Sequence, residues 1–327
     1  MLGRVSVLVV TGTDTGVGKT IVTAAIAALA YDRGSSVAVV KPAQTGVGPT
    51  EAGDLDEVRR LSGVTTTFEF ARFPDPLSPA AAARVSGMPP VSLASAARRI
   101  EELRESNQLV LVEGAGGLLV RFDEDGATLA DLAKRLGAQV LVVTRAALGT
   151  LNHTALTLEA MAHRGLDLAG LVIGEWPVEP GLAERCNVAD LEMLAARPLA
   201  GVLPAGASRC GTGALPAATV GSGGAVPPDR AGSPDRAVPP DGAGSPHGAG
   251  SPDRAGSPDK AGSPDGAAGS AVGASGGSGV GGGESGAPVS RPATCADFTT
   301  LARRSLAPSL GGVFDPAAFR RTLKLTG

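Results

Sequence analysis

The chain has 327 residues, of which 29 are basic and 32 acidic, and its formal net charge is −3. Because Lys and Arg form no block, the sequence argues against nucleic-acid binding, which relies on clustered cations that neutralise phosphates. No apolar run reaches the roughly 18 residues of a membrane-spanning helix, and the N-terminus shows no signal-peptide pattern. The three cysteines, Cys186, Cys210 and Cys295, suit neither a disulfide framework nor a metal knuckle, so we expect a reduced, cytoplasmic protein.

Short apolar runs alternate with segments of helical length along most of the chain. The expected strands are Ser6–Val10, Val37–Val40, Leu109–Val112, Val140–Val143 and Ala169–Ile173. The expected helices are Thr20–Arg33, Ser92–Glu105, Thr128–Leu136 and Leu151–His163. Strands joined by helices of this length imply right-handed crossovers. We therefore predict an α/β fold with a doubly wound, mostly parallel sheet and helices on both faces, of the phosphate-loop NTPase type.

One stretch has a different composition. Between Pro228 and Pro264 a proline recurs every six residues, in units such as GSPDRA and VPPDGA. Such a sequence has too little apolar surface to form a packed core. We expect residues 207–291 to be a disordered insertion, and residues 1–206 plus 292–327 to form a single nucleotide-binding catalytic domain. The domain should tolerate the insertion because loop-closure entropy grows slowly with length.

The strongest local motif follows the first expected strand and reads TGTDTGVGKT, from Thr11 to Thr20. A glycine-rich loop between a strand and a helix lets backbone N–H groups converge on a phosphate, and the helix N-terminus adds positive potential. Lys19 would reach the outer phosphates, and the Thr20 hydroxyl would coordinate Mg²⁺. Five residues separate Gly12 from Gly18, whereas the usual phosphate loop has four.

Two further motifs follow the second and third expected strands. KPAQTG begins at Lys41, which would lie at the carboxyl edge of the sheet, where ligands bind in this class of fold. Read alone, Lys41 could also be a solvated lysine at a strand end. VEGAGG places Glu113 at the end of an apolar run, as expected for a magnesium contact. A carboxylate that caps a turn is the alternative for Glu113.

Two weaker motifs lie elsewhere. GDLD contains Asp54 and Asp56, one of which an ordinary helix N-cap would explain. LGTLNH, from Leu148 to His153, places backbone donors at a helix start that could bind an anion. A capped helix with a structural His153 explains that motif equally well.

Taken together in this order, TGTDTGVGKT, KPAQTG, GDLDE, VEGAGG and LGTLNH resemble the dethiobiotin synthetase family. The resemblance covers about residues 5–205 and resumes weakly near residues 294–325. The long loop spacing is a feature of that family. The resemblance implies an ATP-dependent ligase of biotin biosynthesis that joins CO₂ to 7,8-diaminononanoate and closes the ring of dethiobiotin. It also implies a cytoplasmic homodimer.

The resemblance implies specific roles. Lys41 and Lys19 would be catalytic, and Thr20, Asp54 and Glu113 would hold Mg²⁺. Substrate contacts would come from Thr45, Gly149, Thr150, Leu151 and Asn152, the last four across a dimer interface. Nucleotide contacts would come from Gly16, Val17, Gly18, Lys19, Thr20, Ile21, Asp54, Glu113, Gly114, Ala115, Gly116, Gly174, Glu175, Leu203, Pro204 and Ala205.

The sequence departs from the family where the nucleotide base is read. Family members commonly recognise adenine through an Asn, and this chain has Gly174, followed by Glu175 and Trp176. A contact of this kind can be worth one to a few kcal/mol. The departure therefore predicts that CTP or GTP serves as well as ATP.

Two other classes of protein share this style of phosphate loop. A cobyrinate amide-forming synthase would need a glutaminase domain with a nucleophilic Cys in a tight turn, and none of the three cysteines has that setting. A partitioning-type ATPase carries a Lys near the start of its loop, as in KGGVGKT. Here the corresponding residues read DTGVGKT, so the signature Lys is absent.

Overall fold

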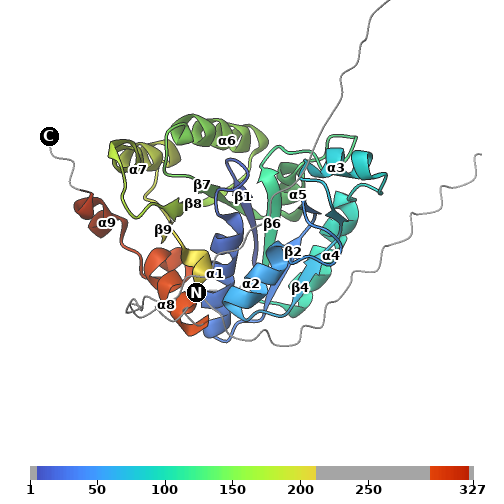
Figure 1. Ribbon diagram of the computed structural model, residues 1–327, viewed down its shortest axis with the longest axis horizontal. Helices are drawn as coiled ribbons and strands as arrows, with labels where there is room; N and C mark the ends of the chain where they lie inside the picture. Colours follow the sequence, from blue (N-terminus) through green and yellow to red (C-terminus); the bar gives the residue numbers. More distant parts are fainter. Residues whose placement is uncertain (1–5, 211–294, 324–327) are drawn as a thin grey trace, which may run out of the picture. The chain divides into compact units, whose positions relative to one another are not determined.

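The fold is built on a seven-stranded sheet. The structure, a computed structural model, describes residues 6–210 and 295–323. The strand order is β4-β2-β6-β1-β7-β8-β9, and neighbouring strands pair in parallel (Figure 1). The strands are β1 (Ser6–Gly12), β2 (Val37–Lys41), β4 (Thr67–Glu69), β6 (Leu109–Gly117), β7 (Gln139–Thr144), β8 (Leu168–Trp176) and β9 (Gly201–Pro204). The predicted doubly wound parallel sheet is confirmed.

Helices cover both faces of this sheet. One face packs against α1 (Lys19–Asp32), α2 (Asp54–Ser62) and α8 (Cys295–Ser305). The other packs against α3 (Pro79–Ser86), α4 (Leu93–Ser106), α5 (Leu129–Leu136), α6 (Thr150–Arg164) and α7 (Leu182–Ala195). In Figure 1, α6 and α7 lie side by side along the top of the view. A second, two-stranded parallel sheet joins β3 (Gln44–Thr45) to β5 (Arg72–Phe73).

The apolar strands deliver polar residues to one edge of the sheet. Val37, Ala38, Val39 and Val40 are all buried, and Lys41 follows them at the end of β2. Burying a valine side chain contributes about 1.5–3 kcal/mol, so Val37, Val39 and Val40 stabilise β2 within the core. The central strand β1 lies between β6 and β7, and Val10 pairs with Glu113 on β6. The ends of β1, β2 and β6 therefore meet.

The last described segment closes the sheet at its β9 edge. There α8 packs beside α1 and β9, and Leu306 forms an antiparallel bridge with Gly201. The Ala307 N–H donates to the Ala200 carbonyl at 2.8 Å. The chain continues through η2 (Pro308–Leu310) and α9 (Pro316–Thr322). Residues on both sides of the gap between 210 and 295 thus belong to one folded unit.

The expected insertion begins inside this unit. Residues 207–209 form the short 3₁₀ helix η1 (Ala207–Arg209), and the Ala207 side chain is buried. The folded domain therefore continues past the expected boundary at residue 206, at least to Cys210, whose carbonyl accepts a hydrogen bond from Arg60 at 2.8 Å. The rest of the expected insertion, 211–291, lies outside the described residues.

Several elements had no clear sequence signal. The expected strands and helices are found within a few residues of their predicted ends, but β3, β4, β5, β9, α3, α7, α8 and α9 were not predicted. Among the helices that the structure describes, none has the length and apolar character needed to cross a membrane.

Candidate functional site

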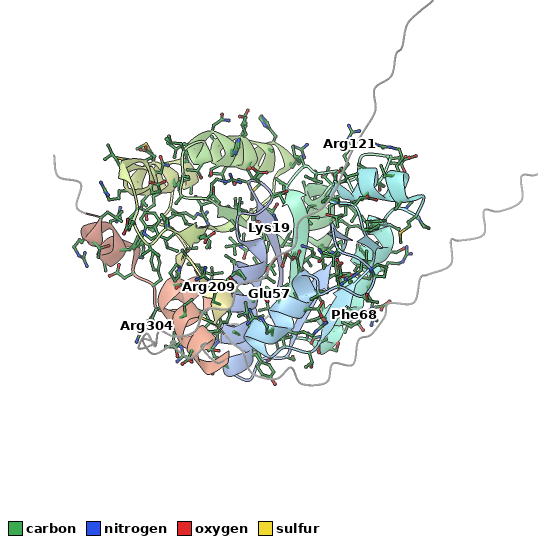
Figure 2. All side chains as sticks on the ribbon, viewed as in Figure 1. Lys19, Glu57, Phe68, Arg121, Arg209 and Arg304 are labelled. Carbon is green, nitrogen blue, oxygen red and sulfur yellow. The ribbon has the colours of Figure 1, made fainter. Side chains whose placement is uncertain are left out.

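A cavity of about 830 Å³ opens at the carboxyl ends of the central strands. Its walls come from the phosphate loop, from the ends of β2, β6 and β8, and from the loops around residues 76–79 and 204–208. Lys19, at the start of α1, is labelled in Figure 2 near the middle of the view. The cavity thus lies where a doubly wound fold binds its ligands.

The phosphate loop is packed tightly against the end of β8. Gly18 has a left-handed backbone, with φ 93°, and a β-carbon there would lie 2.8 Å from the Gly174 carbonyl oxygen. A β-carbon at Gly174 would lie 1.9 Å from the Val17 carbonyl oxygen. Neither position has room for a side chain. The Gly at 174, which departs from the family, is therefore required by the close approach of two backbone segments.

Lys19 is held within the loop that it follows. Its Nζ donates to the Asp14 carbonyl at 3.0 Å, and its side chain is buried. Burial, together with the nearby positive charge of Lys41, lowers the pKa of Lys19 from 10.5 to about 8. A lysine with this pKa is mostly charged at pH 7 and loses its proton as the pH rises through 8, and an anionic ligand would favour its charged form.

We expect nucleotide affinity to fall as the pH rises above about 8. Below that pH, Lys19 is already charged in the free protein, whereas above it a bound triphosphate must recruit a proton to Lys19. Linkage predicts a loss of at most about tenfold per pH unit. Nucleotide titration calorimetry between pH 7 and 9.5 measures this slope. In Lys19→Arg, whose guanidinium stays charged, the slope should disappear; an equal slope in both proteins would contradict the assignment to Lys19.

Lys41 is at the centre of a buried charged cluster. Its Nζ lies 2.5 Å from Asp54 Oδ2 and 2.8 Å from Glu113 Oε1, and it donates to the Gly114 carbonyl at 3.2 Å. Burial by itself would lower the pKa of Lys41, but Glu113 and Asp54 outweigh it and raise the pKa to about 12. Lys41 is therefore a permanent cation, and the solvated strand-end alternative does not describe it.

Glu113 joins this cluster to the phosphate loop. The Thr20 hydroxyl donates to Glu113 Oε1 at 2.8 Å, the same oxygen that contacts Lys41. The Glu113 side chain is fully buried, and its Oε2 has no hydrogen-bond partner among the described residues. Buried carboxylate oxygens without a partner are rare in proteins. Glu113 therefore has the capacity to bind a further donor or a cation.

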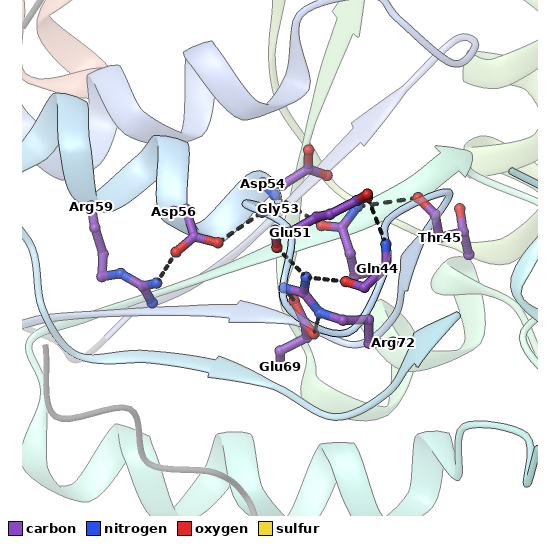
Figure 3. Close-up of polar contacts among 10 residues, drawn as sticks. Gln44, Thr45, Glu51, Gly53, Asp54, Asp56, Arg59, Glu69 and Arg72 are labelled. Atoms are coloured by element: carbon purple, nitrogen blue, oxygen red, sulfur yellow. Dashed lines mark hydrogen bonds and ion pairs between the residues drawn. The ribbon is translucent and has the colours of Figure 1, made fainter. Parts of the chain in front are cut away.

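Asp54 reaches the cluster from a loop that side chains hold in place. Figure 3 shows this loop, which runs from Gly46 to Gly53, with Gln44 and Arg72 beside it. Gln44 Oε1 accepts from the Asp54 N–H at 2.9 Å, and Arg72 donates to the Glu51 carbonyl at 2.7 Å. Asp54 is the first residue of α2, so the helix start presents its carboxylate to Lys41.

Most of the residues that the sequence assigns to the site line the cavity. These are Gly16, Gly18, Lys19, Thr20, Ile21, Lys41, Thr45, Asp54, Glu113, Ala115, Gly116, Gly174, Glu175 and Pro204. Val17, Gly114, Leu203 and Ala205 are not part of the lining. The Leu203 side chain is fully buried in the core, so any contact from this position to a ligand would have to come from the backbone.

The start of α6 lies apart from the cavity lining. Gly149 caps α6 with a left-handed backbone, and Gly149, Thr150, Leu151 and Asn152 do not line the cavity. A chain of hydroxyls, buried at Thr144 and Thr150, nevertheless joins this helix to the phosphate loop. Thr144 Oγ1 lies 2.6 Å from Thr150 Oγ1 and 3.3 Å from Thr13 Oγ1. The two regions are thus connected within one protomer.

Some lining residues were not assigned from the sequence. They are Thr15, Ala43, Gln44, Val47, Pro76, Leu77, Ser78, Pro79, Val120, Gly206, Ala207 and Ser208. Gln44 lies inside the KPAQTG motif between Lys41 and Thr45, which were both assigned to the site, so its position in the motif could have suggested it. Residues 76–78 lie in the bend that leads into α3, which begins at Pro79, and residues 206–208 adjoin the low-complexity stretch. For both groups we find no local signal of a ligand.

Solved structures share parts of this fold at low similarity. The structure of chloroplast FtsY from Physcomitrella patens matches 62% of this chain and 60% of its own, at 23% identity and a TM-score of 0.38. MinD complexed with Mg-ADP from Pyrococcus horikoshii matches 61% of this chain and 81% of its own, at 14% identity and a TM-score of 0.40. These similarities are too low for an inference about function.

Sequence relatives are far more similar. Residues 6–208 match a family model described as an AAA domain. The ATP-dependent dethiobiotin synthetase BioD of Frankia casuarinae is 72% identical over 61% of this chain and 84% of its own length. The protein of the same name from Streptomyces coelicolor is 60% identical over 62% of this chain and 84% of its own. With the matched phosphate loop and the Lys41 cluster in place, the chain belongs to the family of ATP-dependent dethiobiotin synthetases.

Proposed function

We propose that this protein catalyses the nucleotide-dependent carboxylation and ring closure of 7,8-diaminononanoate to dethiobiotin in biotin biosynthesis. The observation that carries the proposal is the contact of Lys41 with Asp54 and Glu113 beside the phosphate loop. The family model matches residues 6–208, which include every residue of that cluster, and the relatives that bear the name of this activity align over 200 and 208 residues of the chain.

The chemistry needs fixed positive charge next to a transferring phosphoryl group. One amine of the substrate captures CO₂ as a carbamate, and a carbamate oxygen attacks the γ-phosphorus while ADP leaves. The second amine then attacks the carbamoyl carbon, phosphate leaves, and the five-membered urea closes. Lys19 and Lys41 would stabilise the charge that develops on these oxygens, since both line the cavity and are held in place before the reaction.

The donor set fits a magnesium ion. Mg²⁺ is usually held by one or two carboxylates together with substrate phosphates and waters. Thr20, Asp54 and Glu113 would supply the protein ligands, and the unpartnered Glu113 Oε2 is available for this purpose. The described residues contain no cluster of three or more His, Cys, Asp or Glu side chains that could hold a metal alone. When bound, Mg²⁺ would neutralise charge on the phosphoryl group.

The nucleotide base would lie between β8 and the loop after β9. Gly174, Glu175, Pro204 and Gly206–Ser208 line this part of the cavity. Since the Gly174 position has no room for a side chain, no amide at this position can read adenine. We propose that CTP and GTP serve alongside ATP, because the base would then be contacted mainly by backbone groups of β8 and of the loop after β9.

A homodimer would complete the substrate site. The family resemblance implies substrate contacts at the start of α6, which does not line the cavity of its own protomer. Leu148 is 80% exposed and Leu156 is 57% exposed, next to and on α6. Apolar side chains gathered on one surface are typical of protein interfaces. We propose that α6 packs against a second copy, in the cytoplasm, where the nucleotide and the diamine would be available.

Fixation of labelled bicarbonate tests this function. Protein, Mg²⁺ and a nucleotide should convert label into acid-stable product only when 7,8-diaminononanoate is present, because a free carbamate decomposes in acid and a closed urea does not. Parallel reactions with ATP, CTP and GTP should give rates within about tenfold, the discrimination expected when about 1.4 kcal/mol or less separates the bases. Nucleotide hydrolysis without retained label would instead indicate an ATPase that works as a switch.

A further inference from the structure

The helix that carries Asp54 begins without a capping side chain of its own. Its N-cap residue is Gly53, and the free N–H groups at a helix start need acceptors. The Asp56 carboxylate accepts from the Gly53 N–H at 2.7 Å, and Gln44 Oε1 accepts from the Asp54 N–H at 2.9 Å. A residue from β3, ten positions earlier in the chain, therefore fixes the backbone of Asp54.

The side chain and backbone of Gln44 are held in position by burial and hydrogen bonds. Its side chain is buried, its backbone N–H donates to the Ala71 carbonyl at 2.9 Å, and its Nε2 donates to the Thr45 carbonyl at 3.2 Å. The Asp54 N–H is a donor, so only the amide oxygen of Gln44 can face it. Gln44 also lines the cavity, where Figure 3 shows it between Asp54 and Thr45.

Arg72 holds the rest of the loop that leads to Asp54. It contacts Glu69 through Nε at 2.7 Å and Nη2 at 3.0 Å, which orients the guanidinium. Its Nη1 donates to the Gly48 carbonyl at 3.2 Å and to the Glu51 carbonyl at 2.7 Å. Both strands of the small sheet thus contribute one side chain to this loop, Gln44 from β3 and Arg72 from β5.

The two side chains meet at Gly53. A β-carbon on Gly53 would lie 2.9 Å from Arg72 Nη2 and 3.0 Å from Gln44 Oε1. The start of α2 is therefore in close contact with Gln44 and Arg72, and a larger residue at position 53 would displace one of these side chains. The Asp54 carboxylate itself is 35% exposed, and the contact that fixes it in the structure is the one with Lys41.

We propose that Gln44, supported by Arg72, is the positioning residue for Asp54 as a magnesium ligand. It acts through the Asp54 backbone: its oxygen and one amide hydrogen are taken by main-chain groups. If Lys41 turns toward the reacting phosphoryl group, the contact between Lys41 and Asp54 is lost, and Gln44 keeps the carboxylate where the metal needs it. The proposal rests on the proposed function, in which Asp54 is a metal ligand.

Metal binding, measured without turnover, tests the proposal. Mn²⁺ would replace Mg²⁺ and be followed by electron paramagnetic resonance in the full chain with saturating ADP. Gln44→Leu, which keeps the volume and loses the acceptor, should weaken Mn²⁺ binding by roughly 10–100-fold, the usual loss for residues that support a metal ligand. Gln44→Glu keeps an acceptor oxygen and should bind Mn²⁺ within a few-fold of the unmodified protein. Affinity for ADP without metal should be unchanged in both.

Arg59→Gln is the matched control. Arg59 lies on the same helix, contacts Asp56 and Thr67, and does not line the cavity. It should lower thermal stability without changing Mn²⁺ affinity. Unmodified Mn²⁺ affinity in Gln44→Leu, or an equal loss in Arg59→Gln, would overturn the proposal. Asp54→Asn provides the reference: if it binds Mn²⁺ normally while labelled product still forms, the premise about Asp54 fails and the proposed function stands.

Discussion

Replacing Lys41 with glutamine should lower the turnover rate by about 10²–10³-fold, the loss typical of removing one group that stabilises developing charge. Lys41 is the cation that both Asp54 and Glu113 contact, and its pKa of about 12 keeps it charged across the working pH range. The glutamine would supply a dipole in place of a full charge. Turnover is measured as acid-stable label at saturating diamine, nucleotide and Mg²⁺, so that weaker binding does not contribute.

The same substitution should also destabilise the protein. Breaking a buried ion pair by removing one partner costs about 3–5 kcal/mol, because the other charge is left buried and uncompensated. Glu113 is fully buried, so it would bear that penalty. Urea unfolding measures the loss, and Mg²⁺ with nucleotide should recover part of it. Lys134→Gln removes an exposed lysine from α5, outside the cavity lining, and should change neither quantity. A Lys41→Gln protein with turnover within tenfold of the original would contradict the catalytic role.

Glu113→Gln should lower turnover by about 10²-fold or more and shift the Mg²⁺ dependence to higher concentration. The substitution keeps the size of the side chain but removes the charge that faces Thr20 and Lys41, and metal binding at such a site supplies several kcal/mol of charge stabilisation. The measurement is turnover as a function of Mg²⁺ concentration at fixed nucleotide. Part of the lost rate should return at high Mg²⁺.

A carboxylate outside the cavity provides the comparison for Glu113. Glu57 lies on α2, pairs with Arg60 at 2.5 Å and does not line the cavity. Glu57→Gln removes the same charge and should leave the Mg²⁺ dependence unchanged. If Glu113→Gln lowers the rate equally at every Mg²⁺ concentration, Glu113 acts by holding Lys41 and not by binding the metal.

The fold class could be predicted from the amino-acid sequence, and so could the sheet edge at which the candidate site lies. TGTDTGVGKT, KPAQTG and VEGAGG each follow a short apolar run, and a run of that kind with helices between predicts a buried parallel strand. Carboxyl ends of parallel strands share one edge, so Lys19, Lys41 and Glu113 were expected to meet. In the structure all three line one cavity. These inferences succeed because burial and turn formation are encoded locally.

Other features depend on contacts between segments that are distant in the sequence. Gln44 and Arg72 hold the loop before Asp54 because a two-residue parallel sheet brings their strands together, and such short strands have no periodicity to read. The helix α8 packs beside α1 and β9 although 84 residues separate it from the preceding described segment. The loop from Gly206 to Ser208 lines the cavity beside a low-complexity stretch. Each of these features depends on packing between distant parts of the chain, and a local sequence pattern does not predict such packing.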